Sequence, residues 1–165
     1  IKEDGVVPVA VLLTHGHFDH AMAAQEVAEQ YGIKIYAHET EKETLETPQI
    51  NLSGMIGRTL TFHADCYVKD GAILNLAGFE IRVLHTPGHT QGGVCYYVEK
   101  EGVLFSGDTL FCCSVGRSDF ATSSTSALIR SIKEKLFLLP DETKVFPGHM
   151  GATTIGNEKV NNPYV

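Results

Sequence analysis

The stretch Thr14-His15-Gly16-His17-Phe18-Asp19-His20 directly follows a nearly continuous apolar run, Val6 to Leu13. The run is rich in valine, which predicts a strand that is buried on both faces and ends at the histidines. Side chains at i and i+2 of an extended segment point the same way, so the His-x-His pair can bind one ion. The turn that follows would then direct Asp19 and His20 at a neighbouring ion.

The rest of the chain predicts alternating strands and helices. Residues Ala21 to Tyr31 are helix formers with Gly32 as the C-cap, and Ile33 to Ala37 predicts a second strand, which makes a βαβ unit. Because no repeat or linker interrupts the 165 residues, we expect one domain over residues 1–165. Further on, we expect a short helix over 40–47, a loop over 48–63, hairpins over 72–84 and 94–105, a helix from Ser123 or Ser124 to about Phe137, and a strand over 144–146.

Three more predicted strands also end in polar loops that carry histidine or aspartate. Carboxylate and imidazole side chains delivered from several strand ends are what a catalytic metal site requires, and Asp108 is the natural bridge between two ions because it has two carboxylate oxygens. A chance cluster of polar residues would explain one histidine alone, but it explains the ordered set poorly. The predicted ligands are His15, His17, Asp19, His20, His89, Asp108 and His149.

Composition excludes several classes of function. The net charge is −7 and the 13 basic residues are scattered, so a nucleic-acid partner is not expected. No apolar run approaches the roughly 20 residues that span a bilayer, and the acidic start, Ile1 to Gly5, is unlike a signal peptide. The four cysteines show no Cys-x-x-Cys spacing, and the adjacent pair Cys112-Cys113 is poorly placed to bridge to itself. These features favour a reducing, cytoplasmic location without a membrane partner.

Thr14 to His20, together with Thr86-Pro87-Gly88-His89-Thr90, Gly107-Asp108-Thr109 and Pro147-Gly148-His149, closely resembles the metallo-β-lactamase superfamily. The resemblance spans the chain and implies an α/β fold, the αββα sandwich. Only 14 residues precede His15, whereas the family has several strands before this turn, so some N-terminal strands are expected to be missing. The zinc β-lactamases with a cysteine at position 108 lack the bridging carboxylate. This chain has Asp108 and also keeps His20, which points away from a β-lactamase.

The family resemblance also implies how the ligands divide between two divalent metal ions. Zinc is expected, although iron or manganese would suit the same donors. Asp108 would contact both ions, and a hydroxide bridging them would be the nucleophile, with Asp19 orienting it. One ion would be held by His15, His17 and His89, and the other by Asp19, His20 and His149.

A closer resemblance is to the glyoxalase II-like hydrolases, through Phe105 to Phe111, Gly116 to Phe120 and Pro147 to Glu158. It implies a thioesterase whose small-molecule substrate is a thioester such as hydroxyacylglutathione. Gly116 to Phe120 is also similar to the persulfide dioxygenases, which use one iron, and this is the alternative function. A non-catalytic metal-binding or partner-binding module is a third hypothesis, which the intact ligand set disfavours.

Several residues outside the ligand set have two interpretations. Arg117 can pair with a substrate carboxylate through its guanidinium, or it can form a structural salt bridge with Asp119. The remaining histidines, His38, His63 and His85, are assigned to structure because none completes the site. The acyl group of the substrate and the oligomeric state stay open.

Overall fold

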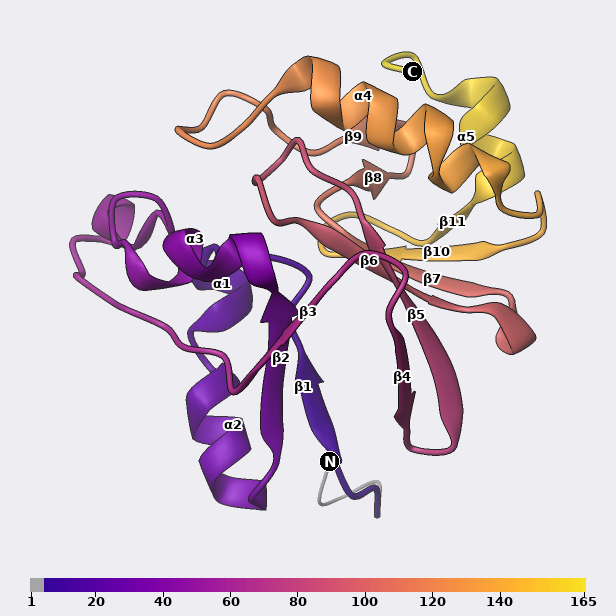
Figure 1. The fold of residues 1–165 in the computed structure, drawn as a ribbon. Coiled ribbons are helices and arrows are strands. Elements are labelled where there is room, and N and C mark those ends of the chain that lie inside the picture. Colours follow the sequence, from indigo (N-terminus) through magenta and orange to yellow (C-terminus); the bar gives the residue numbers. More distant parts are fainter. Residues whose placement is uncertain (1–4) are drawn as a thin grey trace.

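The structure is a computed structural model that describes residues 5–165. The N-terminal part of the chain forms one sheet and the layer of helices that covers it (Figure 1). Strands β1 (Ala10–Leu12), β2 (Lys34–His38) and β3 (Cys66–Val68) form a parallel sheet. Its outer face is covered by helices α1 (Phe18–Ala21), α2 (Ala24–Tyr31) and α3 (Lys42–Glu46), and the short 3₁₀ turns η1 (Glu39–Glu41) and η2 (Ser53–Ile56) lie in the same part.

The second layer pair is built from the rest of the chain. A six-stranded sheet has the order β11-β10-β7-β6-β5-β4, and helices α4 (Thr125–Glu134) and α5 (Ile155–Asn161) cover its outer face. The two sheets face each other, so the predicted αββα sandwich is confirmed. The strands are β4 (Ile73–Leu76), β5 (Phe79–His85), β6 (Val94–Val98), β7 (Val103–Gly107), β10 (Lys144–Pro147) and β11 (Thr153–Thr154), with the 3₁₀ turns η3 (Glu99–Glu101) and η4 (Leu136–Leu138) between them.

The largest buried cluster lies between the six-stranded sheet and its helices. Leu104 of β7 and Val145 of β10 present fully buried side chains to Leu128 and Ile132 of α4. Burying a large aliphatic side chain contributes about 1.5–3 kcal/mol. This cluster therefore fixes α4, and with it the loops at the ends of the strands beneath.

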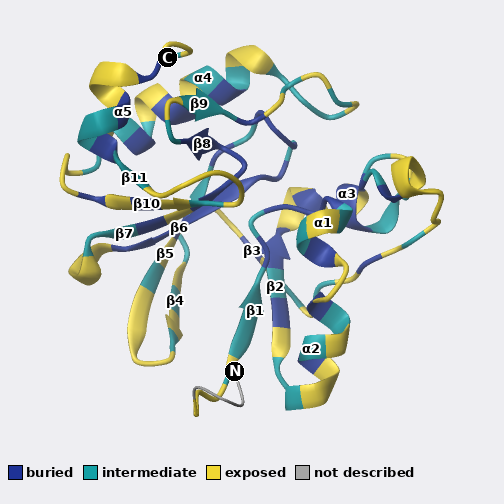
Figure 2. Ribbon diagram, turned by 180° about the vertical axis from the view of Figure 1, so that it is seen from behind, coloured by how far each residue is buried: buried dark blue, intermediate teal, exposed yellow. Residues whose placement is uncertain are grey.

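Two hydrogen bonds join the sheets directly where β1 ends. The buried hydroxyl of Tyr96 in β6 donates to the carbonyl of Leu13 at 2.9 Å, and the Val94 amide donates to the carbonyl of Thr14 at 2.8 Å. Figure 2 shows β6 and the loops above it buried, whereas the tip of the β4–β5 hairpin is exposed. The segment that carries the His-x-His pair is thereby attached to the opposite sheet.

The prediction for the first strand was wrong in extent. Only Ala10–Leu12 forms a strand, and its residues are half-buried rather than buried on both faces. The expected first half is exposed, with Val6 at 58%, Val7 at 81% and Val9 at 48%. The physical reason is that β1 lies at the edge of its sheet, where β2 pairs with it on one side alone. An apolar run predicts burial only if both neighbours are present.

Other predicted elements are confirmed with shifted bounds. The helix expected over residues 21–31 begins at Ala24 as α2, whereas Ala21 is the last residue of the separate α1. The left-handed Gly32 ends α2 as expected. The Ser124 side chain accepts the Ala127 amide as the N-cap of α4. Both predicted hairpins, the helix over 40–47 and the strand that begins at Lys144 are present.

The short pairings and the last helix were not predicted. They are β3, β11, α5 and the two-stranded hairpin of β8 (Leu110–Phe111) and β9 (Ser114–Val115). Strands of two or three residues are too short to show a periodicity. Within residues 5–165, no helix is long and apolar enough to cross a membrane. The expectation for the acidic start concerns residues 1–4, which lie outside the described part, and the single domain over 1–165 stays a prediction.

One glycine in the loop before His89 is predicted to be essential for stability. Gly88 has a φ of 146°, and a Cβ there would collide with the backbone of Leu128 in α4. We expect Gly88→Ala to destabilise the fold by about 3 kcal/mol, the upper end of the cost of overpacking, as measured by urea unfolding. Gly102→Ala is the control, because Gly102 also has a positive φ but open space around it, and should cost about 1–2 kcal/mol. Equal losses of unfolding free energy in Gly88→Ala and Gly102→Ala would show that the collision with Leu128 does not destabilise the fold.

Candidate metal centre

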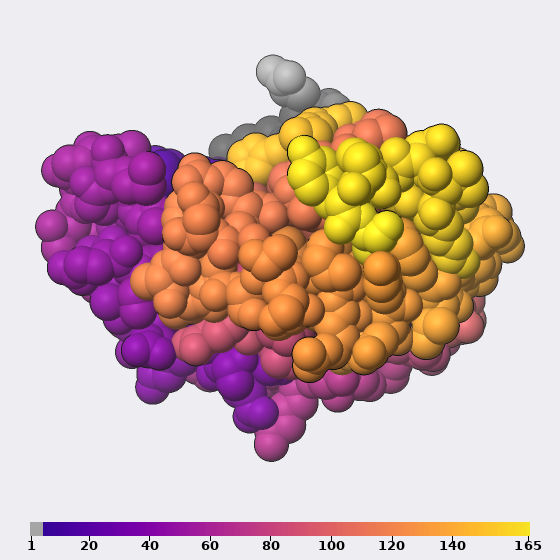
Figure 3. All heavy atoms as spheres, turned by 90° about the horizontal axis from the view of Figure 1, so that it is seen from above, coloured from indigo at the N-terminus to yellow at the C-terminus, as the bar shows by residue number. Residues whose placement is uncertain are grey.

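Four strands of the two sheets end at the same edge of the sandwich, and their loops carry all seven predicted ligands. Strands β7 and β10 run parallel, so Asp108 and His149 follow their carboxyl ends side by side. The loop after β5 brings His89, and the loop and helix after β1 bring the other four. In the view onto this edge (Figure 3), the N-terminal part of the chain meets the part after residue 110 along a seam. The seven ligands are His15, His17, Asp19, His20, His89, Asp108 and His149.

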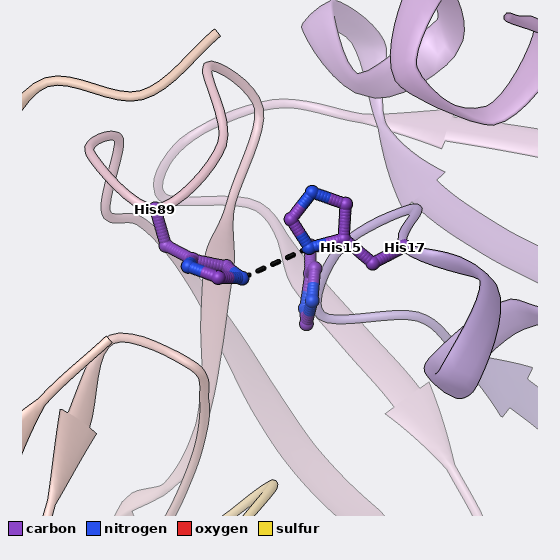
Figure 4. Close-up of side chains that lie close together, drawn as sticks. All are labelled: His15, His17 and His89. Carbon is purple, nitrogen blue, oxygen red and sulfur yellow. Dashed lines mark hydrogen bonds between the residues drawn. The ribbon is translucent and has the colours of Figure 1, made fainter. Parts of the chain in front are cut away.

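Three buried imidazoles form the inner part of the centre (Figure 4). Nε2 of His89 lies 3.0 Å from Nδ1 of His17, the contact drawn as a dashed line. The His15 ring lies edge-on to both, with centroid distances of 4.8 Å. One nitrogen of each residue can lie within 4.8 Å of the others, a spacing that can hold one ion.

The outer part of the centre opens to solvent. His149 Nε2 lies 3.3 Å from the Asp19 carboxylate and 3.4 Å from His20 Nε2. The side chains of Asp19 and His149 are 42% and 52% exposed. These three residues form a second group that can hold an ion, and it lies on the side that a dissolved molecule can reach.

Asp108 lies between the two groups. Its Oδ2 is 3.6 Å from His89 Nε2 of the inner group and 3.4 Å from His149 Nε2 of the outer group. Its Oδ1 is 3.4 Å from His20 Nε2. One carboxylate thus lies near an imidazole nitrogen of each group, and its contact with two ions stays a prediction.

Burial keeps the inner imidazoles in the form that binds metal. Desolvation, followed by the neighbouring imidazoles, lowers the pKa of His15 well below its usual value and the pKa of His17 to about 3. A neutral imidazole has a free nitrogen lone pair, which is what a metal requires of histidine. Desolvation also raises the pKa of Asp108. A cation beside this carboxylate would reverse that effect.

The residues fit a pair of divalent ions. His15 Nε2 and Asp108 Oδ1 are buried in the centre with no hydrogen-bond partner in the protein. Buried polar atoms are rarely left unsatisfied, and an ion would give both atoms a partner. Nitrogen and oxygen donors together suit zinc, iron or manganese.

The buried carboxylate of Glu41 ties the two inner loops together. One oxygen accepts the Gly16 amide at 2.8 Å, between His15 and His17, and the other accepts the Gly92 amide at 2.8 Å and the Thr90 hydroxyl at 3.0 Å. Desolvation raises its pKa to about 7. Sequence reasoning missed this residue, because a glutamate in a short predicted helix is ordinarily a solvated one.

The backbone on the far side orients His89. Its Nδ1 lies 2.7 Å from the carbonyl of Arg117, which favours Nε2 as the atom that faces the centre. The Arg117 side chain is 63% exposed and makes the bidentate pair with Asp119 that the sequence left open, with distances of 3.0 and 2.9 Å. The guanidinium also stacks 4.4 Å from the centre of the Phe120 ring. Its role toward a substrate stays a prediction.

The other histidines lie outside the centre. The rings of His38 and His85 stack with centroids 4.0 Å apart, and the His85 ring also contacts the carbonyl of Gln91 at 3.0 Å. His63 lies 3.6 Å from Glu46 on the surface. Their assignment to structure agrees with these contacts.

Removing the charge of Glu41 should weaken metal binding. In Glu41→Gln one carboxylate oxygen is replaced by an NH₂ group. The remaining oxygen can accept from the Gly16 amide or from the Gly92 amide, and the NH₂ group then faces the other N–H. We expect metal affinity to fall on the order of 10- to 100-fold, the usual effect of a residue that orients ligands, as measured by competition with a chelator. Glu43→Gln is the control, because Glu43 is exposed and its carboxylate accepts a hydrogen bond from the side chain of Gln91. An unchanged affinity in Glu41→Gln would refute the positioning role.

The stacked His38 should make the fold sensitive to acid. Desolvation and the neighbouring His85 lower the pKa of His38 to about 4 from 6.5. The unfolded chain therefore takes up this proton first, so the contribution is complete above pH 6.5 and is lost as the pH falls toward 4. We expect urea unfolding of the metal-free protein to show a smaller loss over this window in His38→Asn than in the original chain. His63→Asn, at an exposed site, should follow the original curve, and a parallel curve for His38→Asn would show the prediction to be wrong.

Comparisons with known proteins agree with the fold. The family model described as the metallo-β-lactamase superfamily matches residues 2–149. The probable metallo-hydrolase YqgX of Bacillus subtilis is 41% identical over all of this chain and 79% of its own length. Hydroxyacylglutathione hydrolase GloC of Haemophilus influenzae is 37% identical over 94% of this chain and 74% of its own length. The relatives are longer than this chain.

Solved structures superpose closely on this chain. BLEG-1 B3 metallo-β-lactamase matches with a TM-score of 0.94 and 42% identity over 99% of this chain and 79% of its own. TTHA1623 in a di-iron-bound form matches with a TM-score of 0.88 and 35% identity over 99% of this chain and 81% of its own length. ETHE1 from Myxococcus xanthus matches with a TM-score of 0.80 and 29% identity over 98% of this chain and 64% of its own length. On the fold, the ligand pattern and these matches, the chain belongs to the metallo-β-lactamase superfamily, whose members are generally metal-dependent hydrolases.

Proposed function

We propose that this chain hydrolyses thioesters such as hydroxyacylglutathione with two divalent metal ions, of which zinc is our first choice. The observation that carries the proposal is that Asp108 reaches an inner group and an outer group of ligands at once. The similarity to hydroxyacylglutathione hydrolase GloC supports the substrate class. In this proposal one ion binds His15, His17 and His89, the other binds Asp19, His20 and His149, and Asp108 binds both.

The chain's own residues would prepare the reaction as follows. When bound, the divalent ions lower the pKa of water to about 7 and polarise a carbonyl group. The exposed Asp19 carboxylate belongs to the outer group, where it can accept a hydrogen bond from the attacking water and so orient it. A thiol leaving group titrates near 8.5, so the site needs no strong general acid. Asp19 and Asp108 are thus the proposed catalytic residues.

Substrate would enter from the outer group. The Phe120 ring lies edge-on to His17 and His89, with centroid distances of 5.3 and 5.8 Å, and forms an apolar wall beside the inner group. The Arg117 guanidinium stacks over the Phe120 ring. We propose that the wall receives the substrate's aliphatic part while Arg117 attracts a carboxylate of the substrate, as glutathione has.

A persulfide dioxygenase with one iron is the second candidate. The observation that favours it is that the three buried histidines and Asp108 form a complete set for a single ion without the exposed outer group. The similarity to ETHE1 is compatible with it. In the dioxygenase, the outer residues would have no metal to hold.

The experiment that separates the candidates is a metal count paired with activity assays on anaerobically purified protein. About two ions per chain with thioester hydrolysis would support the hydrolase, and one iron with oxygen uptake on glutathione persulfide would support the dioxygenase. A β-lactam is assayed alongside, because the similarity to BLEG-1 B3 metallo-β-lactamase extends over the whole chain. A β-lactam as the preferred substrate would overturn the thioester proposal.

Removing the Asp108 carboxylate should weaken the binding of both ions. We expect Asp108→Ala to lose metal and to reduce kcat/KM for the thioester by on the order of 100-fold or more. Asp141→Asn is the matched control, since Asp141 pairs with Lys159 on the surface. If Asp108→Ala kept full metal content and activity, the bridging assignment would be wrong.

A further inference from the structure

Two cysteines form the tip of the hairpin that follows Asp108. Phe111 pairs with Ser114, so Cys112 and Cys113 alone make the loop between β8 and β9. Cys113 is exposed and Cys112 is half-buried, and neither belongs to the metal centre. Two accessible thiols therefore lie next to each other at one point of the surface.

A buried carboxylate holds this tip in place. Glu158 of α5 is 1% exposed and accepts the Cys113 amide at 2.9 Å. Its two oxygens also accept hydrogen bonds from the side chains of Thr153, Asn157 and Asn162. Cys113 has a φ of 51°, which is unfavourable for a residue with a side chain and is stabilised by this anchor.

In the cluster of Cys112, Cys113 and Glu158, the two thiols are the groups available to bind a ligand. The two sulfur atoms and a Glu158 oxygen lie within 4.8 Å of one another. Glu158 already accepts four hydrogen bonds, so a ligand would bind to the two sulfurs alone. A structural zinc ion ordinarily needs four protein ligands, and these two sulfurs are too few for it.

The spacing also disfavours a direct bond between the two sulfurs. Adjacent residues have Cα atoms about 3.8 Å apart, shorter than the roughly 4.4–6.8 Å of ordinary disulfides. An atom inserted between the sulfurs closes a larger and less strained ring. Desolvation and the Cys112 thiol raise the pKa of Cys113. The raised pKa disfavours the thiolate form that binds a divalent metal.

We propose that Cys112 and Cys113 form a chelating dithiol site for trivalent arsenic compounds. With an aryl arsenoxide, the arsenic–oxygen double bond breaks and two arsenic–sulfur bonds form. The two thiol protons leave with the oxygen as one water molecule. Arsenic stays trivalent, so the step needs no oxidant or reductant. The aryl group remains as the third substituent, so two sulfurs complete the coordination.

The test uses phenylarsine oxide and the mass of the intact, reduced protein in excess 2-mercaptoethanol. We expect one phenylarsenic group per chain that survives the monothiol and is removed by 2,3-dimercaptopropanol. Chelation by two thiols predicts this pattern, because a single protein thiol would exchange with the excess monothiol. The measurement does not depend on the proposed hydrolase activity.

Three variants make the test specific. Cys112→Ser and Cys113→Gly should each reduce the stable adduct to none, and glycine is chosen because it accepts the positive φ of position 113. Cys66→Ser, a half-buried cysteine in β3, should keep the full adduct. Circular dichroism checks that each variant is folded. Absence of a stable adduct in the original chain, or its persistence in folded Cys112→Ser or Cys113→Gly, would overturn the proposal.

Discussion

The burial of three imidazoles and a carboxylate at the seam of two sheets constrains the whole structure. Polar side chains without water cost free energy unless they find partners, and His15 Nε2 and Asp108 Oδ1 have none in the protein. The fold must therefore hold these side chains rigidly enough for a cation to satisfy them. Neutral histidines, whose pKa values are lowered by burial, are the form in which the chain can do so.

That rigidity comes from contacts that cross the seam. The Tyr96 hydroxyl and the Val94 amide bind the end of β1 to the six-stranded sheet. Glu41 then connects the backbone between His15 and His17 with the loop after His89. Because all of these groups are buried except the half-buried Thr14, water competes poorly for the hydrogen bonds. These contacts within the protein thus hold the inner ligands in position.

The two halves of the centre differ in exposure, and this difference gives the site a direction. The inner group is enclosed by the sheets and by Phe120, whereas Asp19 and His149 are half-exposed. A molecule approaching from solvent therefore reaches the outer group first. Superfamily membership makes metal-dependent hydrolysis the general expectation, and the open outer group is what supports thioester hydrolysis in our proposal.

The sequence by itself determined the set of ligand candidates, because His-x-His-x-Asp-His and three later loops follow strands that local patterns predict. The fold class followed from the resemblance of these motifs to the metallo-β-lactamase superfamily. The sequence also predicted the caps at Gly32 and Ser124, which depend on neighbouring residues only. The tertiary structure alone decided the short length of β1, since burial of Val6 and Val7 depends on a neighbouring strand. It alone revealed Glu41, because this carboxylate acts on amides 25 and 51 residues away, and no local pattern encodes contacts at such separations.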